Sequence, residues 1–210
     1  MMKVFIDNDV VIKLAKYNLL GSFGDILEQY GHTPYLLDSL PYVCRIHQGT
    51  FEVLSNAEEH GCVSTFINSA QVATIKSLET INIIGQIDDP NLDAGELVLL
   101  GCVKESCDAN FCSGDKRAIV AIDQHVKGGN IQLFDYSIAT LEQAIKFMLA
   151  CHCSTTVINK IKSKPNVDAA LKACFREASV DRLENTFGAL DSYINHIKSQ
   201  CSALVFSELF

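Results

Sequence analysis

The chain has 210 residues, of which 48% are hydrophobic, and a formal net charge of −8. This length and composition can bury a sizeable core, and the negative charge argues against a surface that is basic throughout and binds nucleic acid over its whole area. No apolar run is long enough to span a bilayer, and the first residues lack the pattern of a signal peptide. We therefore expect a cytoplasmic protein with no membrane segment.

The nine cysteines are odd in number and scattered through apolar segments, with no CxxC pair among them. Their spacing does not match a common zinc pattern, and the only local cluster is Cys151-His152-Cys153. Because a free cysteine behaves as a small hydrophobic residue, we expect reduced and mostly buried thiols.

Strand-like and helix-like segments alternate over the first 150 residues. Short apolar runs predict strands at residues 4–6, 34–37, 109–112 and 131–134. Helical spacing and caps predict helices at residues 10–17, 22–30, 40–47, 50–60, 93–103, 116–126 and 137–151. Residues 63–87 are ambiguous and fit a helix to about residue 78, then a strand at 81–87. The alternation predicts an α/β domain over residues 1–150 with a mainly parallel sheet.

Beyond residue 151 no strand-like segment is found, and residues 167–175 and 180–200 have the pattern of amphipathic helices. We expect a helical C-terminal extension over residues 151–210 that packs on the α/β domain. It could serve as a structural cap or a homodimer surface, or it could grip a substrate or partner.

Acidic residues gather where the predicted strands and one helix place them at a common edge. Asp7 follows the first strand, Asp115 follows the strand at 109–112, and Asp93 and Glu96 share one face of a first helical turn. Such a cluster is costly unless a cation neutralises it, and carboxylate oxygens suit Mg²⁺ or Mn²⁺. We expect all four to be metal ligands. Of these, we expect Asp7, Glu96 and Asp115 to catalyse phosphodiester hydrolysis.

Three of these acids also have a purely structural explanation, whereas Asp7, directly after a buried strand, has the least convincing one. Asp93 and Glu96 suit a helix N-terminus, where the dipole favours negative charge, and Asp115 suits the N-cap of the next helix. Two further acids are expected outside the site: Asp9 facing away from it, and Asp123 on a solvated helix surface.

Three segments, VFIDNDVVIKLA, LDAGELVLL and FCSGDKRAIVAI, together resemble the PIN domain nucleases in the order and spacing of their acids. The resemblance covers roughly residues 1–150. It implies a Rossmann-like α/β/α sandwich and an endonuclease that cuts single-stranded RNA or DNA with Mg²⁺ or Mn²⁺.

Residue by residue, Asp7 matches the acid of the family's first strand, Glu96 the acid of its Gly-Glu helix and Asp115 the acid after the next strand. Asp93 matches a frequent accessory acid. Small bacterial members often act as toxins neutralised by a neighbouring protein, so the resemblance also implies an inhibitor or antitoxin as a partner, with RNA as the first expected substrate.

The sequence departs from the family pattern at two places. Many members carry a glutamate on the helix after the second strand. This chain has Asp38 and Glu52 in that region, but neither aligns with the family's glutamate, so the fourth acid of the site is not identified. After the last acid, where the family often has another, this chain has Lys116 and Arg117. Beside the acids, these two cations could contact a substrate phosphate.

Two other functions use the same residues. Haloacid-dehalogenase-like phosphatases also begin with a strand that ends in Asp-x-Asp, in which case Asp7 is the nucleophile and Asp9 the general acid. Against this alternative, Val10 and Val11 replace the usual small or hydroxyl residues. The second alternative is a PIN-like fold that binds a partner without catalysis.

Overall fold

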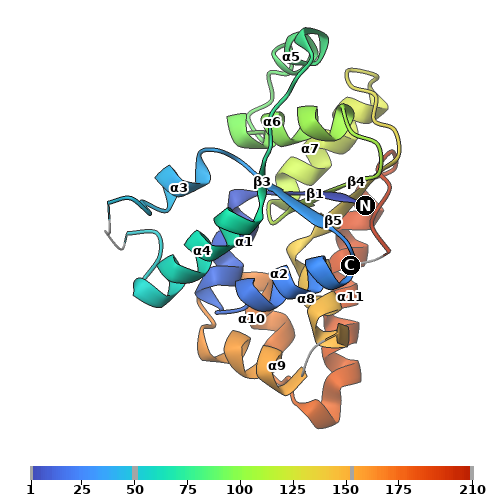
Figure 1. Ribbon diagram of the computed structural model, residues 1–210. Helices are drawn as coiled ribbons and strands as arrows, with labels where there is room; N and C mark the ends of the chain where they lie inside the picture. Colours follow the sequence, from blue (N-terminus) through green and yellow to red (C-terminus); the bar gives the residue numbers. More distant parts are fainter. Residues whose placement is uncertain (1, 49–51, 152–153, 209–210) are drawn as a thin grey trace.

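The computed structural model describes residues 2–48, 52–151 and 154–208 and has an α/β fold built on one parallel sheet (Figure 1). The strands are β1 (Lys3–Ile6), β2 (Thr33–Leu36), β3 (Gln71–Val72), β4 (Ala109–Ser113) and β5 (Tyr136–Thr140). The longer helices of the first part are α1 (Asn8–Lys16), α2 (Leu20–Gln29), α4 (Ala57–Ser69), α6 (Ala94–Lys104), α7 (Lys116–Lys127) and α8 (Leu141–Cys151). Two short helices, α3 (Leu40–Val43) and α5 (Leu78–Ile84), complete it. The predicted α/β fold with a parallel sheet is confirmed.

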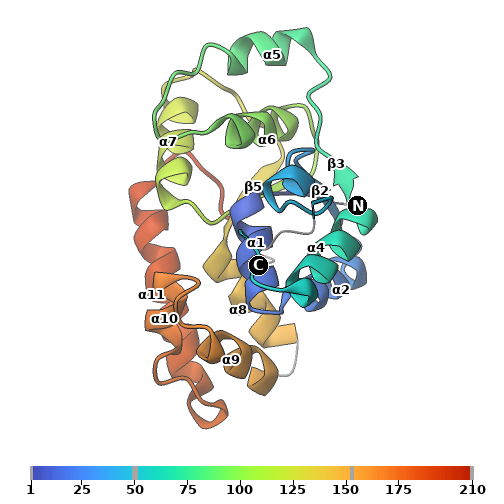
Figure 2. The ribbon, with the colours of Figure 1, turned by 90° about the vertical axis from the view of Figure 1, so that its left-hand side faces the viewer.

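Helices cover both faces of the sheet, as the side chains of β1 require. Val4 and Ile6 belong to one hydrophobic cluster, with α1, α2, α4 and α8, whereas Phe5 belongs to a second cluster with α6 and α7. Successive residues of a strand point to opposite faces, so a strand with three consecutive apolar residues must be covered on both sides. Figure 2 shows the resulting three layers from the side.

The strand order is β3-β2-β1-β4-β5, with every neighbouring pair parallel. From β1 the chain builds the sheet outward in one direction through β2 and β3, and then returns to add β4 and β5 on the other side. In sheets of this kind, ligands bind outside the carboxyl ends of the two strands where the direction reverses. Here those strands are β1 and β4, and Ile6 at the end of β1 pairs with Cys112 of β4.

The ambiguous segment at residues 63–87 differs most from expectation. Residues 81–87 were expected as a strand, but α5 spans Leu78–Ile84, and β3 precedes it at Gln71–Val72. The helix begins at Ser77, whose hydroxyl accepts a hydrogen bond from the Thr80 N–H. An N-cap serine followed by isoleucines at helical spacing is the sequence signal that favours a helix over a strand here.

The last strand also lies elsewhere: β5 spans Tyr136–Thr140 rather than residues 131–134, and α8 begins at Leu141 rather than at 137. Thr140 and Gln143 form reciprocal hydrogen bonds between side chain and backbone N–H. This capping box starts the helix and ends the strand.

Two predicted helix ends are wrong as well. The helix expected at residues 50–60 runs over Ala57–Ser69 and passes through Gly61, and the one expected at 40–47 ends at Val43. Residues 50 and 51 lie outside the described ranges.

The C-terminal helices are α9 (Ser154–Ser163), α10 (Ala169–Phe175) and α11 (Leu183–Gln200), with a 3₁₀ turn at Val180–Arg182 between the last two. They lie together beside α8 (Figure 2). Leu171, Phe175 and Leu190 are fully buried in the same cluster as Val4 and Ile6. Within the described ranges, no helix combines the length and apolar character needed to cross a membrane.

Candidate functional site

Asp7 lies at the exact point where the fold predicts a ligand site. It follows β1 directly and is the N-cap residue of α1, and its backbone N–H donates to the Cys112 carbonyl of β4 at 3.0 Å. Its side chain is only 7% exposed. A carboxylate is therefore held, largely out of water, between the two central strands.

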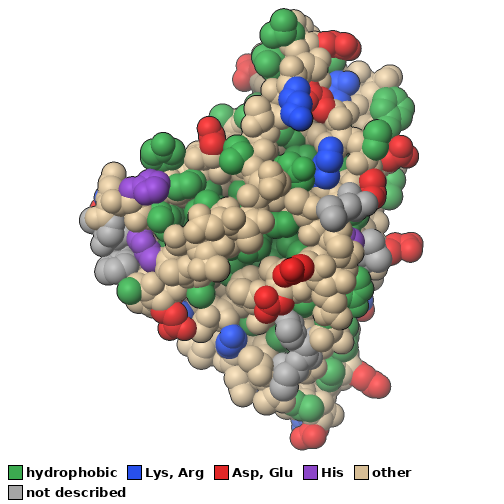
Figure 3. Space-filling view, in the orientation of Figure 1, with side chains coloured by type: hydrophobic (Ala, Val, Ile, Leu, Met, Phe, Trp, Pro, Cys, Tyr) green, Lys and Arg blue, Asp and Glu red, His purple; other side chains and the backbone are tan. Residues whose placement is uncertain are grey.

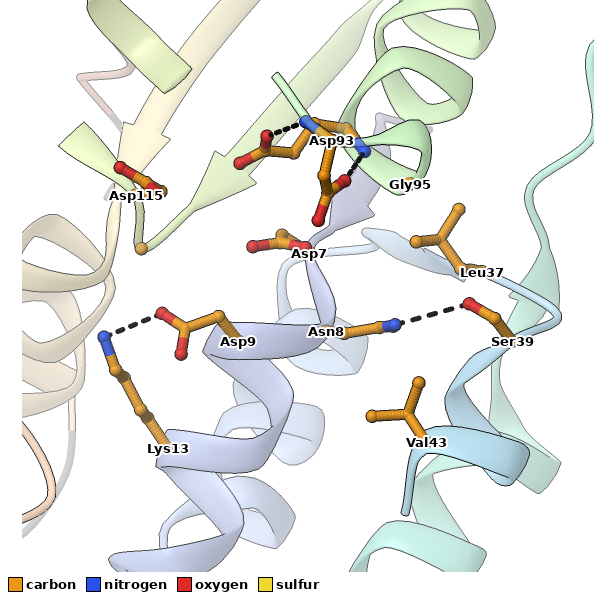
Figure 4. A pocket seen from close by; sticks show the side chains of 12 residues that line it. Asp7, Asn8, Asp9, Lys13, Leu37, Ser39, Val43, Asp93, Gly95 and Asp115 are labelled. Carbon is orange, nitrogen blue, oxygen red and sulfur yellow. Dashed lines mark hydrogen bonds and ion pairs between the residues drawn. The ribbon is translucent and has the colours of Figure 1, made fainter. Parts of the chain in front are cut away.

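Asp93 and Glu96 reach the same region from the start of α6. The Glu96 N–H donates to Asp93 Oδ1 at 2.8 Å, and the Asp93 N–H donates to Glu96 Oε2 at 2.9 Å. This is a complete capping box, so the structural explanation of these two acids holds. Each cap uses one carboxylate oxygen, and the second oxygen of Asp93 is turned toward Asp7 (Figure 4).

Asp115 comes from the loop after β4 and caps α7. Its Oδ1 accepts the N–H groups of Arg117 and Ala118, and its Oδ2 lies 3.2 Å from the Arg117 guanidinium. Burial would raise the pKa of Asp115, but the Arg117 side chain and the two N–H groups outweigh it and lower the pKa. Asp115 is thus a firmly charged acid at this edge.

The two cations predicted to bind substrate point in different directions. The Arg117 side chain is 80% exposed beside Asp115. Lys116 instead forms a 2.6 Å ion pair with the buried Glu142, and its ammonium lies 4.7 Å from the centre of the Tyr193 ring. Only Arg117 is therefore presented to the solvent next to the acids.

All four predicted metal ligands line one open pocket of about 600 Å³ at the carboxyl edge of β1 and β4 (Figure 4). The pocket also contains Asp9 and Lys13, which the nuclease prediction had not placed in the site. Asp9 was expected to face away, but it lies on the pocket wall in a 2.7 Å ion pair with Lys13. The four-residue separation of this pair on a helix is the signal that could have indicated it.

Burial and neighbouring acids raise the pKa of two of these carboxyl groups. Burial, then the charges of Asp9 and Asp93, raise the pKa of Asp7 to about 7. Burial, then the charges of Asp93, Asp7 and Asp115, raise the pKa of Glu96 to about 7, against the lowering effect of the Asp93 N–H. Perturbed acids in a pocket are typical of functional sites.

The donor chemistry of the pocket suits Mg²⁺ or Mn²⁺, because its polar lining is mainly carboxylate and the free oxygen of Asp93 faces Asp7. In the described part of the chain, however, no three His, Cys, Asp or Glu side chains are arranged to hold a metal ion. The acids share a pocket without forming a closed ligand set.

The remaining candidates lie elsewhere. Asp38 is exposed, and Glu52 pairs with Arg45 at 2.6 Å, so neither lines the pocket. Asp123 was expected on a solvated surface, and this is wrong: it is 3% exposed, and its Oδ1 accepts the N–H groups of Ala203 and Leu204. The backbone N–H groups of a segment far along the chain need a hydrogen-bond acceptor, and Asp123 is buried as that acceptor. The periodicity of its helix does not reveal such a long-range contact.

The eight cysteines in the described ranges are all free thiols, and half of them are buried. Two members of the Cys151-His152-Cys153 cluster lie outside those ranges.

Charged side chains of both signs are scattered over the face shown in Figure 3, with no broad basic patch among its described residues. Comparison of the chain with protein-family models, curated proteins and solved structures finds no match.

Proposed function

We propose that this protein is a metal-dependent nuclease that hydrolyses phosphodiester bonds in single-stranded nucleic acid, with RNA as the first substrate to test. The observation that carries the proposal is the convergence of Asp7, Asp93, Glu96 and Asp115 from three separate elements into one pocket at the reversal point of the sheet. The order of these acids, which resembles that of the PIN domain nucleases, supports the same proposal.

In this proposal Asp7, Glu96 and Asp115 are the catalytic acids, and with Asp93 they hold Mg²⁺ or Mn²⁺. A bound ion would activate water and stabilise the charge that develops on the phosphate. The protein supplies the rest: the pairing of β1 with β4 brings Asp7 and Asp115 to the same edge of the sheet, and the α6 cap orients Glu96. Arg117, exposed beside Asp115, is placed to contact a neighbouring phosphate.

The test is cleavage of single-stranded RNA and DNA by purified Asp7→Asn and Glu96→Gln variants with Mn²⁺, and with EDTA as the metal-free condition. We expect each variant to lose at least about 100-fold in rate, because losing a ligand of a catalytic ion costs several kcal/mol of transition-state stabilisation. Glutamine can still accept the Asp93 N–H, so the second variant keeps the α6 cap and removes only the charge.

The matched controls are Asp25→Asn and Glu79→Gln, which change an exposed acid on α2 and an exposed glutamate in the first turn of α5. Both should cleave at the wild-type rate. If the wild-type protein cleaves neither nucleic acid with Mn²⁺ or with Mg²⁺ in its place, the nuclease proposal is wrong and the binding module becomes the better explanation.

The phosphatase alternative has one observation in its favour, because Asp9 lines the same pocket as Asp7. It requires Asp9 to donate a proton to a leaving group, but this carboxylate is engaged by Lys13. Asp9→Asn separates the two functions: it should abolish phosphate-monoester hydrolysis by a phosphatase and only reduce strand cleavage by a nuclease.

A further inference from the structure

The acidic pocket contains one cation that the proposed function leaves without a role. Lys13, on the second turn of α1, is the only lysine or arginine among the described residues that line the pocket. Its side chain is 18% exposed. Figure 4 shows its ammonium at the pocket wall beside Asp9 and on the same side as Asp115.

Two carboxylates hold the ammonium in place. Its Nζ lies 2.7 Å from Asp9 Oδ2 and 2.9 Å from Asp168 Oδ2. The side chain of Asp168 is 14% exposed and is fixed a second time, since its Oδ1 accepts the Leu171 N–H at the start of α10. An ammonium has three N–H donors, so the two carboxylates leave one of them for a ligand.

The two partners differ in how firmly they bind. Asp168 is nearly buried and immobilised by its cap, whereas the Asp9 side chain is 43% exposed. A phosphate oxygen entering the pocket can therefore replace Asp9 as a partner of Lys13 while Asp168 keeps the ammonium in position. Gly114, directly before Asp115, leaves the room for this arrangement, because a Cβ there would collide with the Asp9 carboxylate.

We propose that Lys13 binds a phosphate of the substrate strand next to the phosphodiester that is cut, and that Asp168 of the C-terminal helices is its positioning residue. This inference rests on the proposed nuclease function. A strand of phosphates is repelled by the surrounding acids, and a fixed ammonium at the wall offsets this repulsion beside the ion-binding carboxylates.

The experiment measures binding of a fluorescent single-stranded RNA oligonucleotide to the full chain with Ca²⁺ in place of Mn²⁺, over a range of salt concentrations. Each phosphate contact on a single strand contributes about 0.7 to the slope of log K against log salt. Lys13→Ala should weaken binding about tenfold and reduce the slope by about 0.7, and Lys13→Arg should restore the slope.

The matched control is Asp168→Asn, which breaks the same ion pair but keeps the cation. We expect it to leave the slope unchanged and to lower the cleavage rate with Mn²⁺, because the ammonium is present but less well placed. Lys16→Ala removes a charge from the same helix at a position outside the pocket. It should change neither the slope of the salt dependence nor the cleavage rate.

The inference is overturned if the wild-type protein binds and cleaves the strand while Lys13→Ala keeps the wild-type slope. It is also overturned if Asp168→Asn lowers the slope as much as Lys13→Ala does, since the pair then acts through structure alone. A wild-type protein that neither binds nor cleaves overturns the nuclease function itself, together with this inference.

Should Lys13→Ala fail to fold because Asp168 is left as an unpaired buried charge, the double variant Lys13→Met with Asp168→Asn removes both charges. Replacing a buried ion pair by uncharged groups is often tolerated. This variant should show the same reduced slope, and a slope equal to that of the wild type overturns the proposal.

Discussion

The carboxyl group of Asp7 has a poor environment for its charged form, since it is buried and faces Asp9 and Asp93. Its pKa in the folded protein is about 7, against an ordinary value of 3.8. The folded state therefore binds more protons than the unfolded state between these two values, and its stability falls as the pH rises from about 4 to about 7. Above this window the penalty is fully present.

Asp7→Asn removes this penalty, so without metal ions it should raise the free energy of unfolding by up to about 4 kcal/mol at about pH 8 and change it little at about pH 4. Urea denaturation at the two pH values measures the effect. Asp25→Asn, on an exposed site, should show no such dependence on pH. Equal stability of Asp7→Asn and the wild-type protein at the higher pH would contradict the argument.

At the residue scale, the sequence predicts the acids of the pocket and misses the groups around them. Asp7 and Asp115 can be recognised because each follows a short apolar strand, and Glu96 because it lies three residues after Asp93. Asp168 carries no such signal, because it reaches Lys13 only when the C-terminal helices have folded onto the rest of the chain. Contacts between residues far apart in sequence are set by tertiary packing, which local patterns do not contain.

At the scale of single elements, strands and helices with strong local patterns were predicted, and the caps at Ser77 and Thr140 were missed. The isoleucines at residues 81–87 fit a strand by composition, and Ser77 makes them a helix. Thr140 and Gln143 likewise move the boundary between β5 and α8 by several residues. Hydrogen bonds of single side chains thus select between structures that hydrophobicity leaves almost equal.

Two glycines within helices differ in the space around them, so substitution by alanine should have opposite effects on stability at the two positions. In α6, a Cβ on the buried Gly101 would collide with the Ile75 side chain and lie 3.2 Å from Ile84 Cγ1. In α11, a Cβ on Gly188 would meet nothing within 4 Å. Alanine forms helices better than glycine, but only where there is room for its methyl group.

We therefore expect Gly101→Ala to lower the free energy of unfolding by about 1–3 kcal/mol, and Gly188→Ala to raise it by up to about 1 kcal/mol. Thermal and urea denaturation of the two variants measure the difference. A stabilising Gly101→Ala would mean that Ile75 moves aside at no cost.

At the scale of the whole molecule, a domain boundary was predicted at residue 150, but residues on both sides of it share one hydrophobic core. Leu171, Phe175 and Leu190 lie in the same cluster as Leu14 and Phe23 of the sheet-covering helices. Burying one such side chain contributes about 1.5–3 kcal/mol, and a domain is stable by only about 5–15 kcal/mol. Removing the C-terminal helices would thus cost the remaining residues an amount of burial energy comparable to the whole stability of a domain.

A chain shortened to residues 1–151 should consequently fail to fold cooperatively. Circular dichroism and NMR spectra of the shortened chain would show lost tertiary structure or aggregation. A sharp thermal transition and dispersed NMR signals would instead establish residues 1–151 as an autonomous folding unit.

The segment held by Asp123 also closes the outer side of β5. The Ile138 N–H donates to the Val205 carbonyl, and the Ile138 carbonyl accepts the Ser207 N–H, both at 2.7 Å. At the opposite edge the sheet ends in β3, which has only two residues. Unpaired strand edges are templates for joining with other chains. A proteolytic cut that releases residues 201–207 would expose such a template on β5, so the integrity of this short segment guards the protein against aggregation by strand addition.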